Sequence, residues 1–96
     1  MRDIRDLKSE LYNELIDEMP VLRARLGITQ EVLAMKVGSS RQTVNSVENR
    51  KRDMTWQLFM AIMAVFNHDE TSRKMLSDIP GFNEKLNIVL NEEICK

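Results

Sequence analysis

The sequence predicts an all-α protein, because helical periodicity recurs along the chain and no segment shows the alternation typical of a strand. Apolar residues return every three or four positions over residues 4–19 and again over residues 83–94. Glycine and proline, which interrupt helices, number only three and two. A chain of 96 residues has room for one small helical core with a short extension at each end.

The first expected helix is an amphipathic segment over residues 4–19, with acidic residues opposite its apolar stripe. We expect Pro20 to stop or kink this helix and to begin a second, short one that ends at Leu26. The apolar stripe consists of Ile4, Leu7, Leu11, Leu15 and Met19.

Two further helices separated by a tight turn are predicted in the middle of the chain. Thr29 opens the first, and Gly38 supplies the left-handed residue that ends it. Ser40 caps the second, whose apolar positions Val44 and Val47 can only face inward. Its outward face then carries Arg41, Gln42, Asn45, Ser46 and Asn49. Such side chains match the donor and acceptor edges of bases in a major groove, which indicates DNA binding rather than catalysis.

A basic loop and an unusually apolar helix follow this pair. We expect the helix to run from the cap Thr55 to about Phe66, with Asn67 as a left-handed terminator. Residues 58–66 are apolar on every face, so this helix must be covered all round. We therefore expect the helix or the C-terminal tail to take part in a dimer contact.

The C-terminal tail is expected to hold a short helix over residues 69–77, a turn at Pro80-Gly81 and a last amphipathic helix. The last helix would use Leu86, Val89, Leu90 and Ile94 as its apolar stripe. If that stripe serves dimerisation, a chain cut after Gly81 keeps its central helices folded. The predicted organisation is an N-terminal helix (1–19), a DNA-binding domain (20–67) and a helical tail (68–96).

The net charge of −1 is unevenly distributed. Residues 21–52 have a net charge of +5, whereas residues 1–20 and 53–96 each have a net charge of −3. A basic segment between acidic arms can bind phosphates without binding indiscriminately.

Several other classes are disfavoured by the composition. The longest apolar run has nine residues, too few to cross a bilayer, and no secretory signal precedes the first helix. A single cysteine, Cys95, argues for a reducing cytosol, and with one histidine, His68, it cannot assemble a metal site. We expect a cytoplasmic protein that is not an enzyme and needs no cofactor or metal.

Residues 22–66 resemble the lambda-repressor-like helix-turn-helix family, the Cro and phage-repressor type of bacterial regulator. The elements T-Q-E-x-L-A, S-R-Q-T and V-E-N occur together at the family's spacing. The resemblance implies a bundle of four to five helices that binds double-stranded DNA as a two-fold homodimer. To this bundle the chain adds its N-terminal amphipathic helix and its C-terminal helical tail.

The resemblance also implies roles for single residues. Gln30 matches a phosphate anchor, and Arg23 and Glu48 match an internal salt bridge, which we favour over a phosphate contact for Arg23. Lys51 and Arg52 match the loop that grips the DNA backbone. The expected DNA-binding set is Thr29, Gln30, Ser40, Arg41, Gln42, Thr43, Asn45, Ser46, Asn49, Lys51 and Arg52.

Four positions depart from the family pattern. Ser39 replaces an apolar turn residue, which predicts looser packing, and Met54 replaces the usual proline. Arg50 stands where the family has glycine, so the loop must avoid a left-handed conformation or accept strain. Val32 replaces a polar residue, which suggests that an extra element covers that side.

The leading functional hypothesis is a repressor or autoregulator that acts as a homodimer on a short inverted repeat. The alternative is an antitoxin-type interaction protein, whose terminal helices bind a protein partner and whose DNA binding is autoregulatory. We expect Trp56 to lie in the core rather than to stack on a base. Most of the methionines are expected to fill core gaps, with Met54 and Met60 left open.

Overall fold

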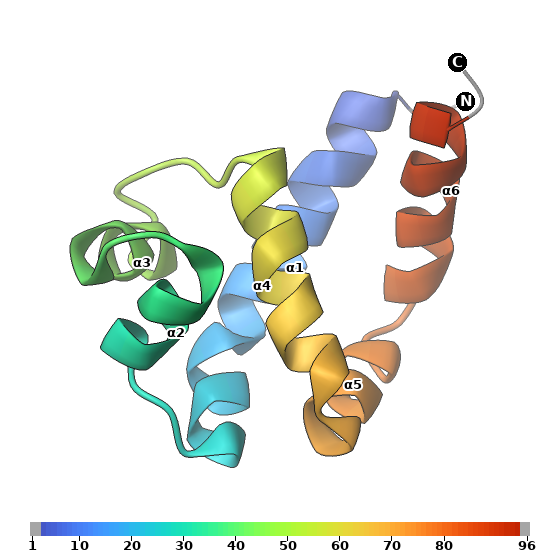
Figure 1. Cartoon of the computed structure of the whole chain (residues 1–96). Helices are drawn as coiled ribbons and strands as arrows, with labels where there is room; N and C mark the ends of the chain where they lie inside the picture. The colour runs from blue at the N-terminus through green and yellow to red at the C-terminus, as the bar shows by residue number, and fades with distance from the viewer. Residues whose placement is uncertain (1–2, 95–96) are drawn as a thin grey trace.

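The computed structural model describes the backbone of residues 3–94 and the side chains of residues 3–92. This part of the chain forms six helices and no strand, so the predicted all-α fold is confirmed (Figure 1). The helices are α1 (Ile4–Leu26), α2 (Gln30–Val37), α3 (Arg41–Glu48), α4 (Trp56–His68), α5 (Glu70–Ser77) and α6 (Phe82–Ile94). None of them is long and apolar enough to span a membrane.

The long helix α1 runs without a break through Pro20, so the expected start of a second helix there is wrong. Proline removes one backbone donor from a helix interior and lowers its stability. Here Pro20 lies on the exposed side of α1, while Met19 and Leu22 on either side of it are fully buried. The burial of these two side chains holds the segment helical until Gly27 ends it at φ 68°.

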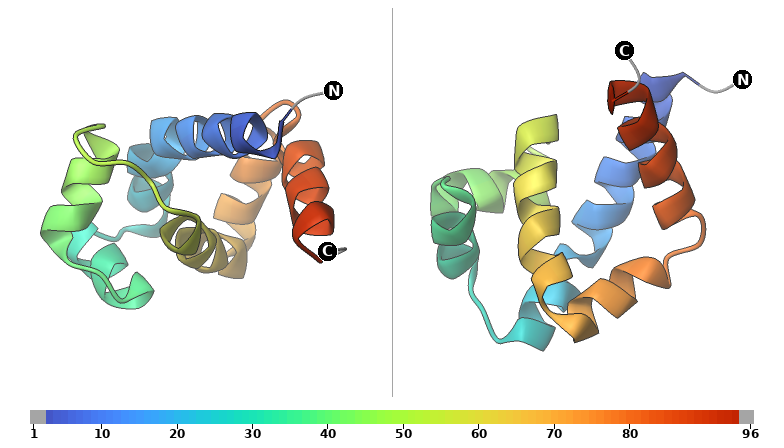
Figure 2. Two further views of the ribbon diagram at one scale, coloured as in Figure 1. Left: turned by 90° about the horizontal axis from the view of Figure 1, so that it is seen from above. Right: turned by 45° about the vertical axis from the view of Figure 1, so that its right-hand side comes forward.

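The helices α1 and α4 pack together in the middle of the molecule. They separate the pair α2 and α3 from α5 and α6, as all views show (Figures 1 and 2). The buried side chains at this centre are Leu11, Leu15 and Met19 of α1 and Phe59, Ile62, Met63 and Phe66 of α4. The DNA-binding candidates therefore lie at one end of a core built by the whole chain.

The helix α6 packs against the N-terminal half of α1. Phe82 and Val89 are fully buried, and the Phe82 ring lies 6.4 Å from that of Phe59. The Lys85 ammonium contacts the carboxylates of Glu10 and Glu14, which lie one turn apart on α1. Val89 is thus used inside the monomer, and the expectation that it belongs to a dimerisation stripe is wrong.

The junction of α4 and α5 corrects another boundary. Asn67 lies inside α4, and Asp69, with φ −99°, separates the two helices, so Asn67 is not a left-handed terminator. The Asp69 carboxylate accepts hydrogen bonds from the backbone N–H groups of Thr71 and Ser72 and caps α5. The buried Ser72 hydroxyl donates to the Phe66 carbonyl at 2.5 Å, which ties the two helices together.

Methionine and tryptophan positions agree only in part with expectation. Trp56 is half-buried and stacks on Phe59 with ring centroids 5.2 Å apart. Met54 is buried and Met60 half-buried, but Met35 on α2 is 74% exposed and does not fill the core.

Candidate nucleic-acid interface

The pair α2 and α3 is built from strong local signals, and its predicted caps and turn are confirmed. The Thr29 hydroxyl accepts from Val32 N at 3.1 Å, and Gly38 ends α2 at φ 71°. The Ser40 hydroxyl accepts from Thr43 N at 3.1 Å and begins α3. Leu33, Ala34, Val44 and Val47 are buried and hold the two helices against each other and the core.

The outward face of α3 carries the polar residues that the sequence placed there. Arg41, Gln42, Asn45 and Asn49 are exposed, whereas Thr43 and Ser46 are half-buried. Asn49 Nδ2 donates to Asn45 Oδ1 at 3.2 Å, which orients both side chains on the helix surface. This face can present guanidinium and amide groups to base edges while the apolar side chains of α3 stay buried.

A shallow hollow lies beside the N-terminal end of α2. It is lined by Arg23, Ile28, Thr29, Gln30 and Glu31, and by Arg41, the first residue of α3. The N–H groups at the start of α2 and the two arginines favour an anion at this place, whereas the Glu31 carboxylate opposes it.

A bidentate ion pair fixes the position of this pair against α1. Arg23 Nε lies 2.7 Å from Glu48 Oε2, and Arg23 Nη2 lies 2.9 Å from Glu48 Oε1. The two side chains are only 17% and 5% exposed. Gln30 Nε2 also donates to Glu48 Oε1, at 3.1 Å, so the group joins α1, α2 and α3. Since a primary amide has two hydrogens, this contact leaves one N–H of Gln30 to donate elsewhere.

The loop between α3 and α4 accepts the left-handed conformation at Arg50, with φ 60°. Ser46 O accepts from the backbone N–H of Lys51 at 2.8 Å and of Arg52 at 3.3 Å. The Arg52 guanidinium donates to the Thr43 hydroxyl at 3.2 Å, so Thr43 links the loop to α3. The side chains of Lys51 and Arg52 are exposed beside α3.

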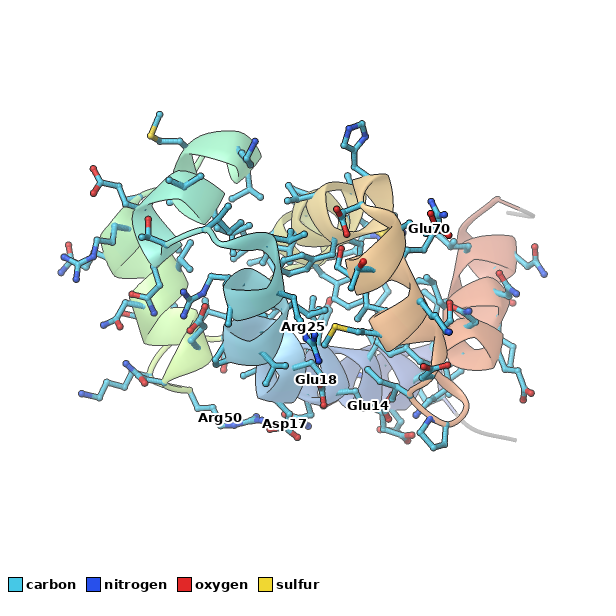
Figure 3. All side chains as sticks on the ribbon, turned by 90° about the horizontal axis from the view of Figure 1, so that it is seen from below. Glu14, Asp17, Glu18, Arg25, Arg50 and Glu70 are labelled. Atoms are coloured by element: carbon cyan, nitrogen blue, oxygen red, sulfur yellow. The ribbon has the colours of Figure 1, made fainter. Side chains whose placement is uncertain are left out.

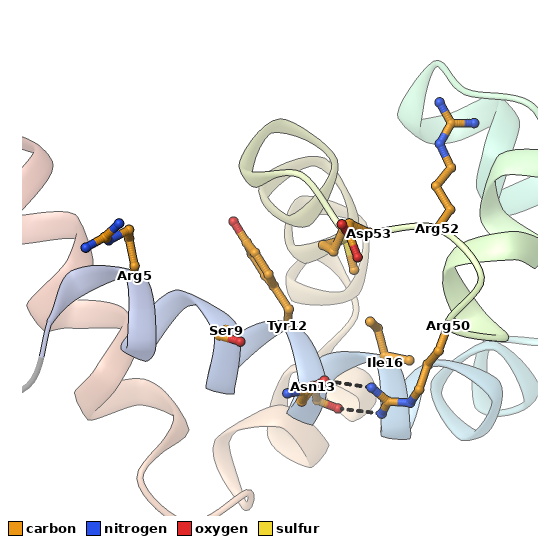
Figure 4. Close-up of a pocket in the computed structure, with 9 residues that line it drawn as sticks. Arg5, Ser9, Tyr12, Asn13, Ile16, Arg50, Arg52 and Asp53 are labelled. Atoms are coloured by element: carbon orange, nitrogen blue, oxygen red, sulfur yellow. Dashed lines mark hydrogen bonds between the residues drawn. The ribbon is translucent and has the colours of Figure 1, made fainter.

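Sequence reasoning missed what the Arg50 side chain does. It lies along α1 and donates to Asn13 and Asp17, while Arg52 points away from α1 (Figure 4). The replacement of a usual glycine by arginine was a signal that this loop is special. It did not identify the partners, which lie 37 and 33 positions away in sequence.

The other departures from the family pattern have different outcomes. Val32 is 36% exposed, so the described part of the chain covers it only in part. Ser39 is half-buried, and its N–H donates to Ala34 O at 2.9 Å as part of the α2 cap. Met54 lies buried between the loop and the core.

Residues 3–92 bring no three histidine, cysteine, aspartate or glutamate side chains together as a metal site. Cys95, from which the sequence analysis inferred a reducing compartment, lies outside the described residues.

Residues 22–67 match a family model described as Helix-turn-helix. The matched segment begins near the end of α1, contains α2, α3 and the basic loop, and ends inside α4. Neither the curated proteins nor the solved structures give a match.

Proposed function

Residues 22–67 make this chain a member of the lambda-repressor-like helix-turn-helix family of DNA-binding regulators, and we propose that it represses transcription as a homodimer. The DNA site is a short inverted repeat, and the promoters that the chain represses include its own. The proposal rests on the exposed polar face of α3. Val44 and Val47 anchor the opposite face of this helix in the core. Selection of binding sites from random DNA with the purified chain tests DNA binding and repeat symmetry together.

Replacing Gln42 by alanine is expected to weaken binding to the selected site by about 1–3 kcal/mol, or roughly 5- to 150-fold. The Gln42 amide is exposed near the start of α3, where it can donate to and accept from one base. A repeated selection with this variant should show relaxed preference at one or two positions. An unchanged sequence preference would mean that α3 is not the reading helix.

Lys51→Ala is the matched control, because Lys51 is an exposed cation in the loop rather than on α3. A lost phosphate contact weakens all sequences alike and lowers the slope of log affinity against log salt by about one. Affinity titrations over a range of salt concentrations on selected and scrambled sites separate the two kinds of residue.

A homodimer is proposed because one recognition helix reads too few base pairs for useful specificity. The surface we favour is an apolar groove beside α4, with a volume of about 520 Å³. We call it the α4 groove; it is lined by Leu26, Ile28, Lys36, Val37, Ala61, Ala64, Val65, His68 and Asp69. Ala64 is exposed and Val65 half-buried, so the chain itself leaves this face of α4 incompletely covered.

Two features of the α4 groove suit a second copy of the chain. On a two-fold axis the same surface meets itself, so Lys36 of one copy can face Asp69 of the other. The groove is bordered by α2 and α4, and no α3 residue lines it. Pairing there leaves both recognition helices free for half-sites about 10 base pairs apart.

Ala64→Glu is expected to convert the dimer to a monomer, because it places two carboxylates near one symmetry axis in an apolar contact. Light scattering should report the monomer mass, and affinity should fall on the full repeat but not on a single half-site. Ile88→Glu is the control, since Ile88 is 51% exposed on α6 and lies outside the groove. Dissociation by the control but not by Ala64→Glu would assign dimerisation to α6.

The antitoxin-type alternative has less support. It assigns the terminal helices to a protein partner, yet α1 and α6 bind each other through Lys85, Glu10 and Glu14 and bury Phe82 and Val89. A repressor that acts by occupying its site needs no such partner.

A further inference from the structure

The basic loop after α3 is attached to α1 by the side chain of Arg50. Arg50 Nη1 lies 2.6 Å from Asn13 Oδ1, and Nη2 lies 2.6 Å from Asp17 Oδ1 and 3.5 Å from Asn13 O. Asn13 and Asp17 are one turn apart on the same face of α1, and Arg50 reaches toward that face (Figure 3). We call these three residues the Arg50 clamp.

The backbone conformation of Arg50 supports a specific role for its side chain. Among residues 3–94, Arg50 is the residue other than glycine with a positive φ, at 60°. Side chains with a Cβ adopt this conformation at a cost, whereas glycine adopts it freely. The structure therefore places a strained residue where a glycine would be relaxed, and the side chain gained by this choice is the one that reaches α1.

The clamp also joins a residue inside the family match to two residues outside it. Asn13 and Asp17 lie before residue 22, outside the matched domain, whereas Arg50 lies inside it. The next two residues, Lys51 and Arg52, are the exposed cations of the loop, and Arg52 turns away from α1 toward Thr43 (Figure 4). The middle of α1 is thus fixed to the segment that presents these cations.

We propose that Arg50 is a positioning residue for DNA binding, which holds the loop in its phosphate-binding conformation through Asn13 and Asp17. This inference rests on the proposed function of α3 and its loop. Arg50 directs its charge at α1, and Lys51 and Arg52 are left to reach the DNA backbone. Ordering the loop before binding removes an entropic cost that would otherwise reduce affinity.

The clamp is exposed, so its removal should leave global stability nearly unchanged. The side chains of Arg50 and Asp17 are 46% and 71% exposed. Exposed ion pairs contribute little to folding. A change in DNA affinity on breaking the clamp will therefore reflect the loop itself rather than the folded fraction.

Asp17→Ala gives the sharpest test, because electrostatics and positioning predict opposite signs. Removing a negative charge beside a basic loop strengthens DNA binding if only the field matters. Loss of positioning weakens it, by roughly two- to tenfold, because the loop must then be ordered on binding. Affinity of the full chain for the selected site is measured by fluorescence anisotropy, with Asp6→Ala, an exposed acid of α1 outside the clamp, as control.

Arg50→Gly tests the same idea from the other partner. It relieves the left-handed strain and removes the clamp, so the protein should be at least as stable as wild type and still bind DNA more weakly. In the double variant with Asp17→Ala the two losses should not add, because Arg50→Gly already removes the contact that Asp17→Ala breaks. Backbone order parameters from NMR should fall at residues 50–53 in each variant without DNA.

Weaker binding together with a more mobile loop supports the proposal. Unchanged or tighter binding by Asp17→Ala overturns it, and so do unchanged order parameters in the loop. If the wild-type chain selects no DNA sequence, the proposed function fails, and the order parameters alone then decide whether Arg50 holds the loop.

Discussion

Replacing Arg23 by alanine is expected to lower the free energy of unfolding by about 3–5 kcal/mol, because it leaves a buried carboxylate unpaired. Glu48 is 5% exposed and receives two hydrogen bonds from Arg23 and one from Gln30. Without Arg23, the neutral Gln30 amide is the one described hydrogen-bond partner that remains beside the Glu48 carboxylate. The loss amounts to a melting temperature about 4–8 °C lower for each kcal/mol in a domain of this size.

Urea titration and thermal melting followed by circular dichroism measure this effect. Arg5→Ala is the control, because Arg5 forms an exposed pair with Asp3 whose removal should leave the melting temperature unchanged. DNA affinity, corrected for the folded fraction, should be the same in wild type and Arg23→Ala. A normally stable variant that binds all DNA sequences more weakly would make Arg23 a phosphate contact instead.

A double replacement, Arg23→Met with Glu48→Leu, separates the two sides of the pair. Removing both charges together removes the unpaired carboxylate, so much of the lost stability should return. Failure to recover would show that the geometry of the bidentate contact, rather than charge burial, holds α1 on α3.

The helix pair was predictable because its signals are local. Thr29, Gly38 and Ser40 each act within four residues of their own position, as caps or as a left-handed terminator. Val44 and Val47 then determine which face of α3 is buried, and the polar face follows from helical spacing alone. Nothing beyond a short window of sequence is needed for these features.

The errors at Pro20 and Asn67 have a different cause, because contacts between helices override a local signal there. Pro20 is a strong local signal for a helix boundary, but the burial of Met19 and Leu22 in the core overrides it. Asn67 is a plausible terminator by composition, but the Asp69 cap and the buried Ser72 hydroxyl place the boundary two residues later. Local preference determines a boundary only where tertiary contacts agree with it.

The polar contacts of the candidate site were predictable only where a known family pattern supplied the pairing. Arg23 and Glu48 were linked by resemblance, whereas the contact of Arg50 with Asn13 and Asp17 had no such guide. The first contact joins α1 to the last residue of α3 across 25 positions of sequence, and the second joins α1 to the loop after α3 across more than 30. Spacing along one helix cannot show which two helices lie side by side.

Phe82→Ala is expected to lower the free energy of unfolding by about 3–5 kcal/mol, the usual range for a fully buried phenylalanine. Phe82 begins α6, is fully buried and packs beside Phe59 of α4. A chain cut after Gly81 loses this residue and Val89 together and uncovers part of α1. The truncated chain should therefore unfold, contrary to the expectation that its helix-turn-helix stays folded.

Urea titration of Phe82→Ala and circular dichroism of the truncated chain measure these effects. Ile88→Ala is the matched control, because it removes an apolar side chain from the same helix at an exposed position. Such a surface change should alter stability by no more than about 0.5 kcal/mol. A truncated chain that melts cooperatively and still binds a half-site would mean that α6 is an appendage, and that residues 3–81 form the folding unit.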